Sequence, residues 1–226
     1  MATRHLLADL IAAASFAGLG DVDLESVGGA DAEQRVAAGE KFDLVFLSDG
    51  ALRRLADLGH VDAASVTPLV LSQTAMAVPS DSLLPAPRPE KPAFPDANGV
   101  RAALRAARSI GYSTGPSGTA LVRLIEEWGL TQAVGDRLVQ ARPGIPVASS
   151  LAARDVDIGF QQLSELVGQP GVGILGVLPD DCAIETVFGG AVASACDSRD
   201  RAAAILEFLA SRETAAKRDR YGFRSR

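Results

Sequence analysis

Hydroxyl-bearing and glycine residues gather in one short loop, GYSTGPSGTA, at residues 111–120. The loop holds Ser113, Thr114, Ser117 and Gly118, and a stretch with helical apolar spacing follows it directly. At the start of a helix, main-chain N–H groups lack partners within the helix, and the positive end of the helix dipole favours an anion. Serine and threonine hydroxyls can donate to the same anion. The loop therefore predicts an anion site, with ordinary helix capping as the alternative.

A second loop of small residues, SVGGAD, contains Gly28, Gly29 and Ala30. Small residues let a ligand approach the main chain at the start of the helix that is expected next. Neither loop carries the Gly-Lys-Ser/Thr ending of a nucleotide-binding P-loop. Several loops of this kind, each between a predicted strand and the helix that follows it, favour binding of one ligand by all of them. On this interpretation, Gly118→Leu would block the ligand without unfolding the protein.

The charge of the chain argues against a nucleic-acid partner. There are 22 basic and 28 acidic residues, which gives a net charge of -6, and no basic stripe could neutralise phosphates. No run of 18 apolar residues is present, so no membrane insertion is expected. Charged residues interrupt the first apolar run, so the chain as given shows no secretory signal and would stay cytoplasmic.

The cysteine and histidine residues do not match a metal motif. The two cysteines are Cys182 and Cys196, and the two histidines are His5 and His60. Their spacing fits no zinc site, so we expect neither a metal nor a cofactor. Two buried free thiols are the simplest interpretation of the cysteines, and a disulfide is the alternative.

The elements that must position these loops alternate between strand and helix patterns. The alternation, with apolar runs typical of strands buried on both faces, predicts an α/β fold with mainly parallel sheets. A helix after the second loop is expected to be capped by Asp31 and to end at Gly39. The other main helices are expected near 3–17, 49–59, 98–108, 118–129, 147–154 and 199–222, and the strands near 21–27, 42–48, 68–79, 109–113, 156–162, 173–179 and 183–194.

This alternation falls into two blocks, roughly 1–75 and 100–180, and two long strands flank the second block. Such a layout predicts two lobes joined by two crossings. The first lobe is expected to combine residues 1–75 with 190–226, and the second to span 76–189. A cleft between lobes is a favoured place for a ligand.

From about residue 3 to 226, the chain resembles the extracellular solute-binding proteins related to the periplasmic molybdate-binding protein. The resemblance is carried by SVGGADAEQRVAAGEKFDLVFLSDGALRRLADLGHVD, SIGYSTGPSGTALVRLIEEWG, VDIGFQQLSEL and AAAILEFLASRETAAKRDRYGF. Some members of this broad group are similar to aconitate isomerase. The resemblance implies a two-lobed Venus-flytrap fold in the periplasm that holds a small anion between its lobes. It also implies an ABC transporter permease as a partner.

The resemblance also assigns ligand contacts. One contact falls on Gly28, Gly29 and Ala30, where the molybdate binders carry serines, and others fall on residues 116–118 and near 144–147. A tyrosine of the molybdate binders corresponds to Gln162, with Gln161 beside it. Because an amide can donate to an oxyanion or a carboxylate, an organic acid fits at least as well as molybdate. Glutamines that follow one another in a strand point to opposite faces, and the family position favours Gln162.

Charged candidates are few. Arg142 could clamp a carboxylate with two hydrogen bonds, although a surface arginine explains it equally well. An isomerase of a small unsaturated polycarboxylate would need a general acid or base, and His5 is the candidate for that role. No pair of titratable groups stands out, so binding of a small anion is favoured over isomerisation.

The family fold places a strand before the first helix, and the tip of that strand supplies the first ligand loop. The helix pattern here starts at residue 3, so we expect the first lobe to lack this strand. Two neighbouring strands would then have unpaired main-chain groups. A gap, a closed-up sheet or a strand from another chain would follow.

Overall fold

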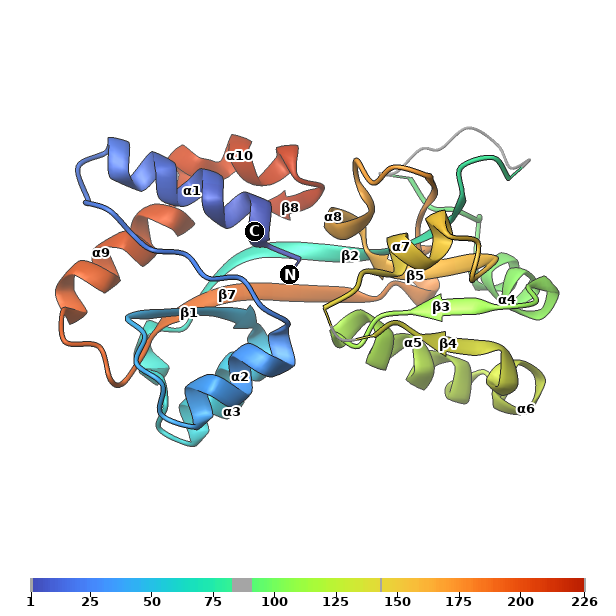
Figure 1. Cartoon of the computed structure of the whole chain (residues 1–226), viewed down its shortest axis with the longest axis horizontal. Helices are drawn as coiled ribbons and strands as arrows, with labels where there is room; N and C mark the ends of the chain where they lie inside the picture. The colour runs from blue at the N-terminus through green and yellow to red at the C-terminus, as the bar shows by residue number, and fades with distance from the viewer. Residues whose placement is uncertain (1, 83–90, 143, 226) are drawn as a thin grey trace. The chain divides into compact units, whose positions relative to one another are not determined.

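The computed structural model describes residues 2–82, 91–142 and 144–225, and the chain divides into two compact units (Figure 1). Unit 1 comprises Met1–Ser72 and Val187–Arg226, and unit 2 comprises Gln73–Thr186. Strands β2 (Thr67–Pro79) and β7 (Glu185–Val192) contribute residues to both units. Each unit combines strands with covering helices, which confirms the α/β class.

Unit 1 contains helices from both the N-terminal and the C-terminal segment of the chain. Helices α1, α9 and α10 lie side by side, while α2 and α3 lie against β1 (Figure 1). Strand β1 pairs antiparallel with β7, and β8 pairs antiparallel with β2. The elements are α1 (Arg4–Phe16), α2 (Gly29–Ala37), β1 (Leu44–Ser48), α3 (Asp49–Asp57), α9 (Arg199–Ala210), α10 (Ala215–Arg220) and β8 (Phe223–Ser225).

The core of unit 1 has two layers, one on each face of β1. Val45 and Leu47 are buried in the cluster that contains Leu52 of α3. Leu44 and Phe46, which alternate with them, pack against the cluster formed by α1 and α9. Because successive side chains of a strand point to opposite faces, this pattern is that of a strand covered on both sides.

Two sequence expectations for unit 1 are wrong. Residues 21–27 form no strand, although half-buried Val22 and Leu24 alternate with exposed Asp23. Alternation determines which side chains face the core, but a strand also needs a hydrogen-bonded neighbour. Helix α2 is not capped by Asp31, because it begins earlier, at Gly29. Gly28 is its N-cap in an extended conformation, and the carbonyl of Gly28 accepts from Ala32 N at 2.9 Å.

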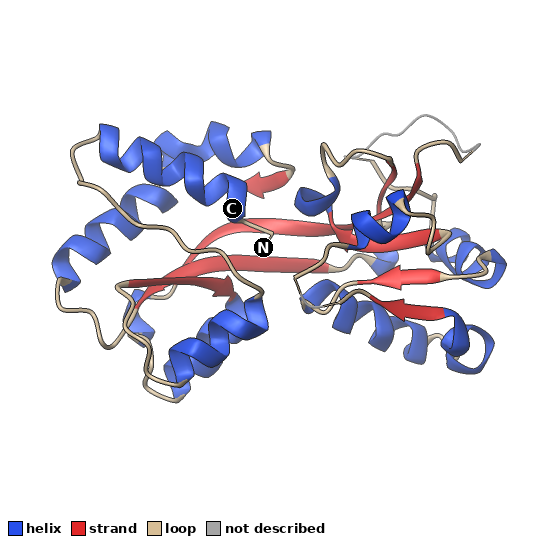
Figure 2. Ribbon diagram, viewed as in Figure 1, coloured by secondary structure: helices blue, strands red, loops and turns tan. Residues whose placement is uncertain are grey.

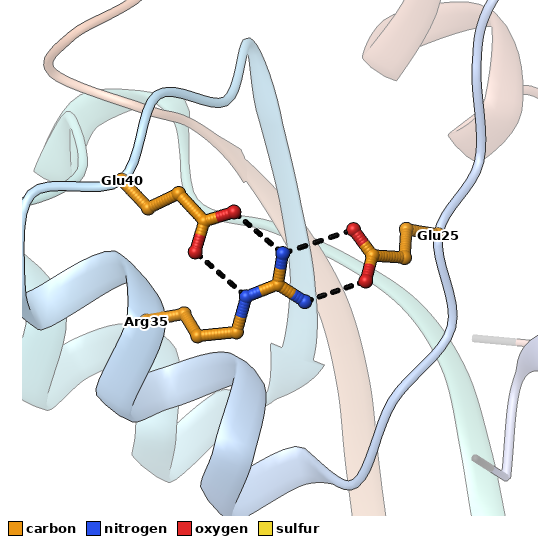
Figure 3. A network of polar contacts seen from close by, with 3 residues as sticks. All are labelled: Glu25, Arg35 and Glu40. Carbon is orange, nitrogen blue, oxygen red and sulfur yellow. Dashed lines mark hydrogen bonds and ion pairs between the residues drawn. The ribbon is translucent and has the colours of Figure 1, made fainter.

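An arginine holds the extended segment 21–28 against α2. The guanidinium of Arg35 donates to both carboxylate oxygens of Glu25, at 2.6 and 3.0 Å, and through Nε to Glu40 at 2.7 Å (Figure 3). It also lies over the ring of Phe42. Arg35 therefore connects the chain entering α2 with the chain leaving it.

Unit 2 alternates strands and helices along the chain (Figure 2). Its strands lie in the order β6–β2–β5–β3–β4. Its elements, besides β2 and β7, are α4 (Ala97–Ala106), β3 (Ile110–Tyr112), α5 (Pro116–Glu127), α6 (Thr131–Val134), β4 (Leu138–Gln140), α7 (Val147–Ala152), β5 (Ile158–Gln162), α8 (Leu163–Leu166) and β6 (Val172–Val177).

Parallel pairing is less common than the sequence predicted. It joins β3 to β4 and β3 to β5, whereas β2 pairs antiparallel with β5 and with β6. Alternation of helices and strands predicts parallel neighbours only where a helix returns the chain to the same edge of the sheet. Strand β2 enters unit 2 from unit 1, and it pairs antiparallel with both of its described neighbours there.

The two faces of the unit 2 sheet carry different helices. On one face, Phe160 and Met76 pack with Leu121 and Ile125 of α5, which follow one another at four-residue spacing. On the other face, Ala75 and Ala77 pack with α7. No helix in the described parts of the chain is long and apolar enough to cross a membrane.

Candidate functional site

Two buried hydroxyls mark the beginning of α5 in unit 2. Ser113 Oγ lies 3.0 Å from Ser117 Oγ, and both residues are buried. Gly115 is the N-cap, Pro116 is the first helical residue, and the first turn carries no acidic side chain. Proline suits this position because it has no N–H to satisfy. The start of α5 therefore combines a positive dipole end with buried hydroxyls and no competing carboxylate.

The N–H groups of this turn are partly used. Gly118 N and Thr119 N both donate to the carbonyl of Gly115, at 3.0 and 3.2 Å. No side chain caps the helix. The main-chain N–H of Ser117 takes part in neither of these two hydrogen bonds. The side-chain hydroxyl of the same residue contacts Ser113 Oγ.

Gly118 has a different role from the one the sequence predicted. A Cβ at this position would overlap the carbonyl oxygen of Ser113. The close approach at Gly118 is therefore one between two parts of the chain. The expectation that Gly118→Leu would leave the fold intact is therefore wrong, whereas the ligand contact at Gly118 stays a prediction. Thr114 and Thr119, the two predicted threonine hydroxyls of this loop, are exposed.

The two glutamines end β5 and point to opposite faces of the sheet. Gln161 stands opposite Ala75, which packs on the α7 side, and Gln162 stands opposite Thr74. Gln162 therefore shares the face of Phe160, on which α5 packs. Both glutamines are buried, with exposed fractions of 3% and 2%. The geometry places Gln162, rather than Gln161, on the side of α5.

Gln162 belongs to a buried polar cluster with Thr74 and Thr186. Gln162 Nε2 donates to Thr186 Oγ1 at 2.9 Å, whereas Gln162 Oε1 and Thr74 Oγ1 are buried without a hydrogen-bond partner in the described structure. The sequence did not single out either threonine, because threonine is also a common strand residue. The sequence feature that could have identified these threonines is that each places a hydroxyl within a largely apolar strand.

The remaining predicted residues belong to α2, to the segment after β4 and to α1. Gly28, Gly29 and Ala30 form the start of α2 in unit 1, where no side chain caps the helix and Asp31 adds a negative charge to the first turn. That carboxylate opposes an anion at this helix end. Arg142 is exposed after β4, and it leads towards α7, a helix of 6 residues. His5 is exposed in α1, and its ring nitrogen lies 3.1 Å from Arg4 Nη2.

The remaining features are a hollow, the two cysteines and the possible metal ligands. A hollow of about 390 Å³ in unit 1 is lined by Ser65, Thr67, Glu207 and Ser211, among others, and by no predicted site residue. Cys182 and Cys196 are buried free thiols, as expected. Among the described residues, no group of three His, Cys, Asp or Glu side chains could hold a metal ion.

The chain is similar in sequence to an aconitate isomerase from Pseudomonas sp.. The two sequences are 33% identical over 183 residues. The match covers 80% of this chain and 66% of that protein, so this chain spans about two thirds of the length of its relative.

Solved structures of low sequence identity share the fold. The periplasmic molybdate-binding protein of Azotobacter vinelandii has a TM-score of 0.74 at 18% identity, over 98% of this chain and 94% of that one. The substrate-binding domain of a putative molybdenum ABC transporter from Clostridium difficile has a TM-score of 0.73 at 15% identity, over 100% and 95%. The family model described as "Bacterial extracellular solute-binding protein" matches residues 1–224. The chain therefore belongs to the family of bacterial extracellular solute-binding proteins.

Proposed function

We propose that this protein binds a small anion at the start of α5 and acts as the solute-binding component of an ABC transporter in the periplasm. The observation that carries the proposal is the buried Ser113–Ser117 hydroxyl pair at a helix start without acidic residues. Hydroxyls, the N–H of Ser117 and the helix dipole suit an oxyanion or a carboxylate. The family membership and the molybdate-binding structural neighbours support a role in solute transport.

The chemistry of this site favours binding over turnover. Its groups are neutral donors, and neutral donors can hold an anion without moving a proton. Release of the ligand to a permease requires such reversible binding. Arg142 is exposed and could add charge at the rim of unit 2.

A thermal-shift and calorimetry screen tests the proposal. The probes are molybdate, tungstate, sulfate, citrate, cis-aconitate and trans-aconitate. A ligand at 100 times its dissociation constant stabilises the protein by about 2.7 kcal/mol. Ser117→Ala should weaken binding about tenfold, because it removes one donor and leaves Ser113 unpaired. Ser149→Ala, an exposed serine of α7, is the control. The proposal fails if no anion shifts the melting temperature, or if Ser117→Ala binds as tightly as the parent.

A second candidate is isomerisation of a small unsaturated polycarboxylate, which the 33% identity to an aconitate isomerase favours. This activity needs an acid or base that meets the substrate. His5 is the candidate from the sequence, and it is exposed beside Arg4. An absorbance assay that starts from either aconitate isomer separates the two functions. Turnover that is lost in His5→Gln would establish the isomerase, whereas binding without turnover supports transport.

A further inference from the structure

An unpaired, buried acceptor atom of Gln162 restricts the kind of ligand that would suit the site. Gln162 is 2% exposed, and its Oε1 has no hydrogen-bond partner in the described structure. Its Nε2 is already engaged, since it donates to Thr186 Oγ1 at 2.9 Å. The amide therefore presents an acceptor, rather than a donor, as its unpaired atom.

A second unpaired group stands next to it. Thr74 is directly opposite Gln162 in the β2–β5 register, and it is 1% exposed. Its Oγ1 is also buried without a partner in the described structure. Unpaired buried polar groups raise the free energy of a fold, so a bound molecule that forms hydrogen bonds with them is favoured.

Gln162 and Thr74 lie on the sheet face that α5 covers. Phe160 and Gln162 lie on the face that α5 covers, and Tyr112, the residue before Ser113, is paired with Phe160. The carboxyl ends of β3 and β5 thus bring the Ser113–Ser117 pair and the Gln162 amide to one edge of unit 2. A ligand that reached both groups would meet hydrogen-bond donors and an unpaired acceptor together.

We propose that the ligand is a hydroxy acid, whose carboxylate is held at the start of α5 and whose hydroxyl donates to Gln162 Oε1. This inference rests on the proposed anion site. A tetrahedral oxyanion such as molybdate or sulfate carries no proton at neutral pH, so it can only accept hydrogen bonds. It would leave Gln162 Oε1 unpaired. Thr186 is a positioning residue, because its contact with Nε2 orients the amide.

The experiment compares ligands that differ by one hydroxyl. Calorimetry measures citrate against tricarballylate and malate against succinate, with molybdate as the oxyanion probe. The hydroxyl-bearing member of a pair should bind at least about tenfold more tightly, because a site built to pair with a hydroxyl rejects analogues that lack it. Molybdate should bind more weakly than citrate.

Variants of Gln162 and Thr186 then test whether the preference for the ligand hydroxyl depends on the Gln162 side chain. In Gln162→Leu, citrate affinity should fall to that of tricarballylate, whose own affinity stays the same. Gln162→Met, which keeps the side-chain length, gives the same test if the leucine variant does not fold. Thr186→Val should reduce the preference for the hydroxyl by freeing the amide to turn. Gln169→Leu, outside the β5 strand, should keep it.

The outcomes separate the two proposals. Equal binding of citrate and tricarballylate overturns the hydroxy-acid inference and leaves the anion site standing. A hydroxyl preference that survives in Gln162→Leu also overturns the inference, as does tightest binding of molybdate. If none of the probes binds, the anion site itself is wrong and the inference falls with it.

Discussion

Gly118 packs against the main chain of Ser113 so closely that a Cβ at residue 118 would overlap the carbonyl oxygen of Ser113. The first turn of α5 is thereby fixed against the end of β3. The same contact brings the hydroxyls of Ser113 and Ser117 to 3.0 Å. A glycine that resembled part of a ligand loop in the sequence is a packing requirement in the structure.

Gly118→Ala should therefore destabilise the protein by about 1–3 kcal/mol, because the new methyl group forces the backbone apart. Urea denaturation measures the loss. Gly135→Ala is the matched control, since no heavy atom lies within 4 Å of its Cβ position and its φ of −54° suits alanine. That control should be neutral or stabilised by about 0.4–1 kcal/mol. Equal denaturation midpoints for the two variants would contradict the packing role of Gly118.

Arg35 should hold the segment 21–28 in place in a pH-dependent way. Hydrogen bonds from Arg35 lower the pKa of Glu25 and of Glu40. A carboxyl whose pKa is lowered by folding stabilises the fold above its unfolded pKa, and this contribution is lost as the pH falls through the folded value. Protection of the amides in residues 21–28, relative to their intrinsic exchange rates, should therefore fall below the ordinary glutamate range. In Arg35→Ala this protection should already be low at neutral pH.

Hydrogen-exchange mass spectrometry is the measurement for this segment. Arg53→Ala is the control, because Arg53 pairs with Asp49 on α3 and does not contact the segment. If exchange in residues 21–28 is the same in Arg35→Ala and Arg53→Ala, the arginine does not hold the segment.

Asp157 should contribute to the stability of unit 2 at neutral pH. One of its carboxylate oxygens accepts from Arg108 N and Nε, at 2.9 and 3.1 Å, and its own N–H donates to Ser109 Oγ at 2.9 Å. The contacts from Arg108 lower the pKa of Asp157. Asp157→Asn should therefore cost about 1 kcal/mol at neutral pH, and less as the pH falls through the lowered pKa. Denaturation at several pH values, with exposed Asp155→Asn as control, checks this; a pH-independent loss would contradict it.

Both cysteines should resist thiol reagents in the folded protein. Burial raises the pKa of Cys182 to about 11, with the Asp181 carboxylate as the next cause, and burial also raises the pKa of Cys196. The thiolate is the reactive form, so little of it exists at neutral pH. Titration with a disulfide reagent should be slow in buffer and should release two equivalents in denaturant, since the chain has 2 cysteines. Rapid labelling of the native protein would contradict burial of the thiols.

The periodic spacing of apolar residues correctly predicted those helices and strands whose buried face it determines. The apolar spacing of α1 and α5 and the apolar run of β5 determine which side chains face the core, and these elements were predicted correctly. Pairing partners depend on distant parts of the chain, so the segment 21–27 and the number of parallel neighbours were predicted wrongly. The short elements α6 and β8, of 4 and 3 residues, give too few positions for a periodic signal.

In the candidate site, too, residues close together in the sequence were predicted, whereas those brought together from distant segments were not. Ser113 and Ser117 were predicted because they share one loop with a helix start, and the structure brings their hydroxyls together. Thr74 and Thr186 were missed because each stands far along the chain from Gln162, and only the neighbouring strands bring them together. The packing role of Gly118 was not predicted, because a requirement for glycine has the same sequence signature whether a ligand or the chain itself lies against it.

Strand β1 has a consequence for concentrated solutions of this protein. It stands at one end of the strand order, paired with β7, while its side chains are covered on both faces. Main-chain groups on the other edge of such a strand can template addition of another polypeptide. The strand has only 5 residues, so the association should be weak and reversible. Static light scattering should then show an apparent mass that grows with protein concentration and returns on dilution, and added salt should not abolish this growth because hydrogen bonds rather than charges carry the contact.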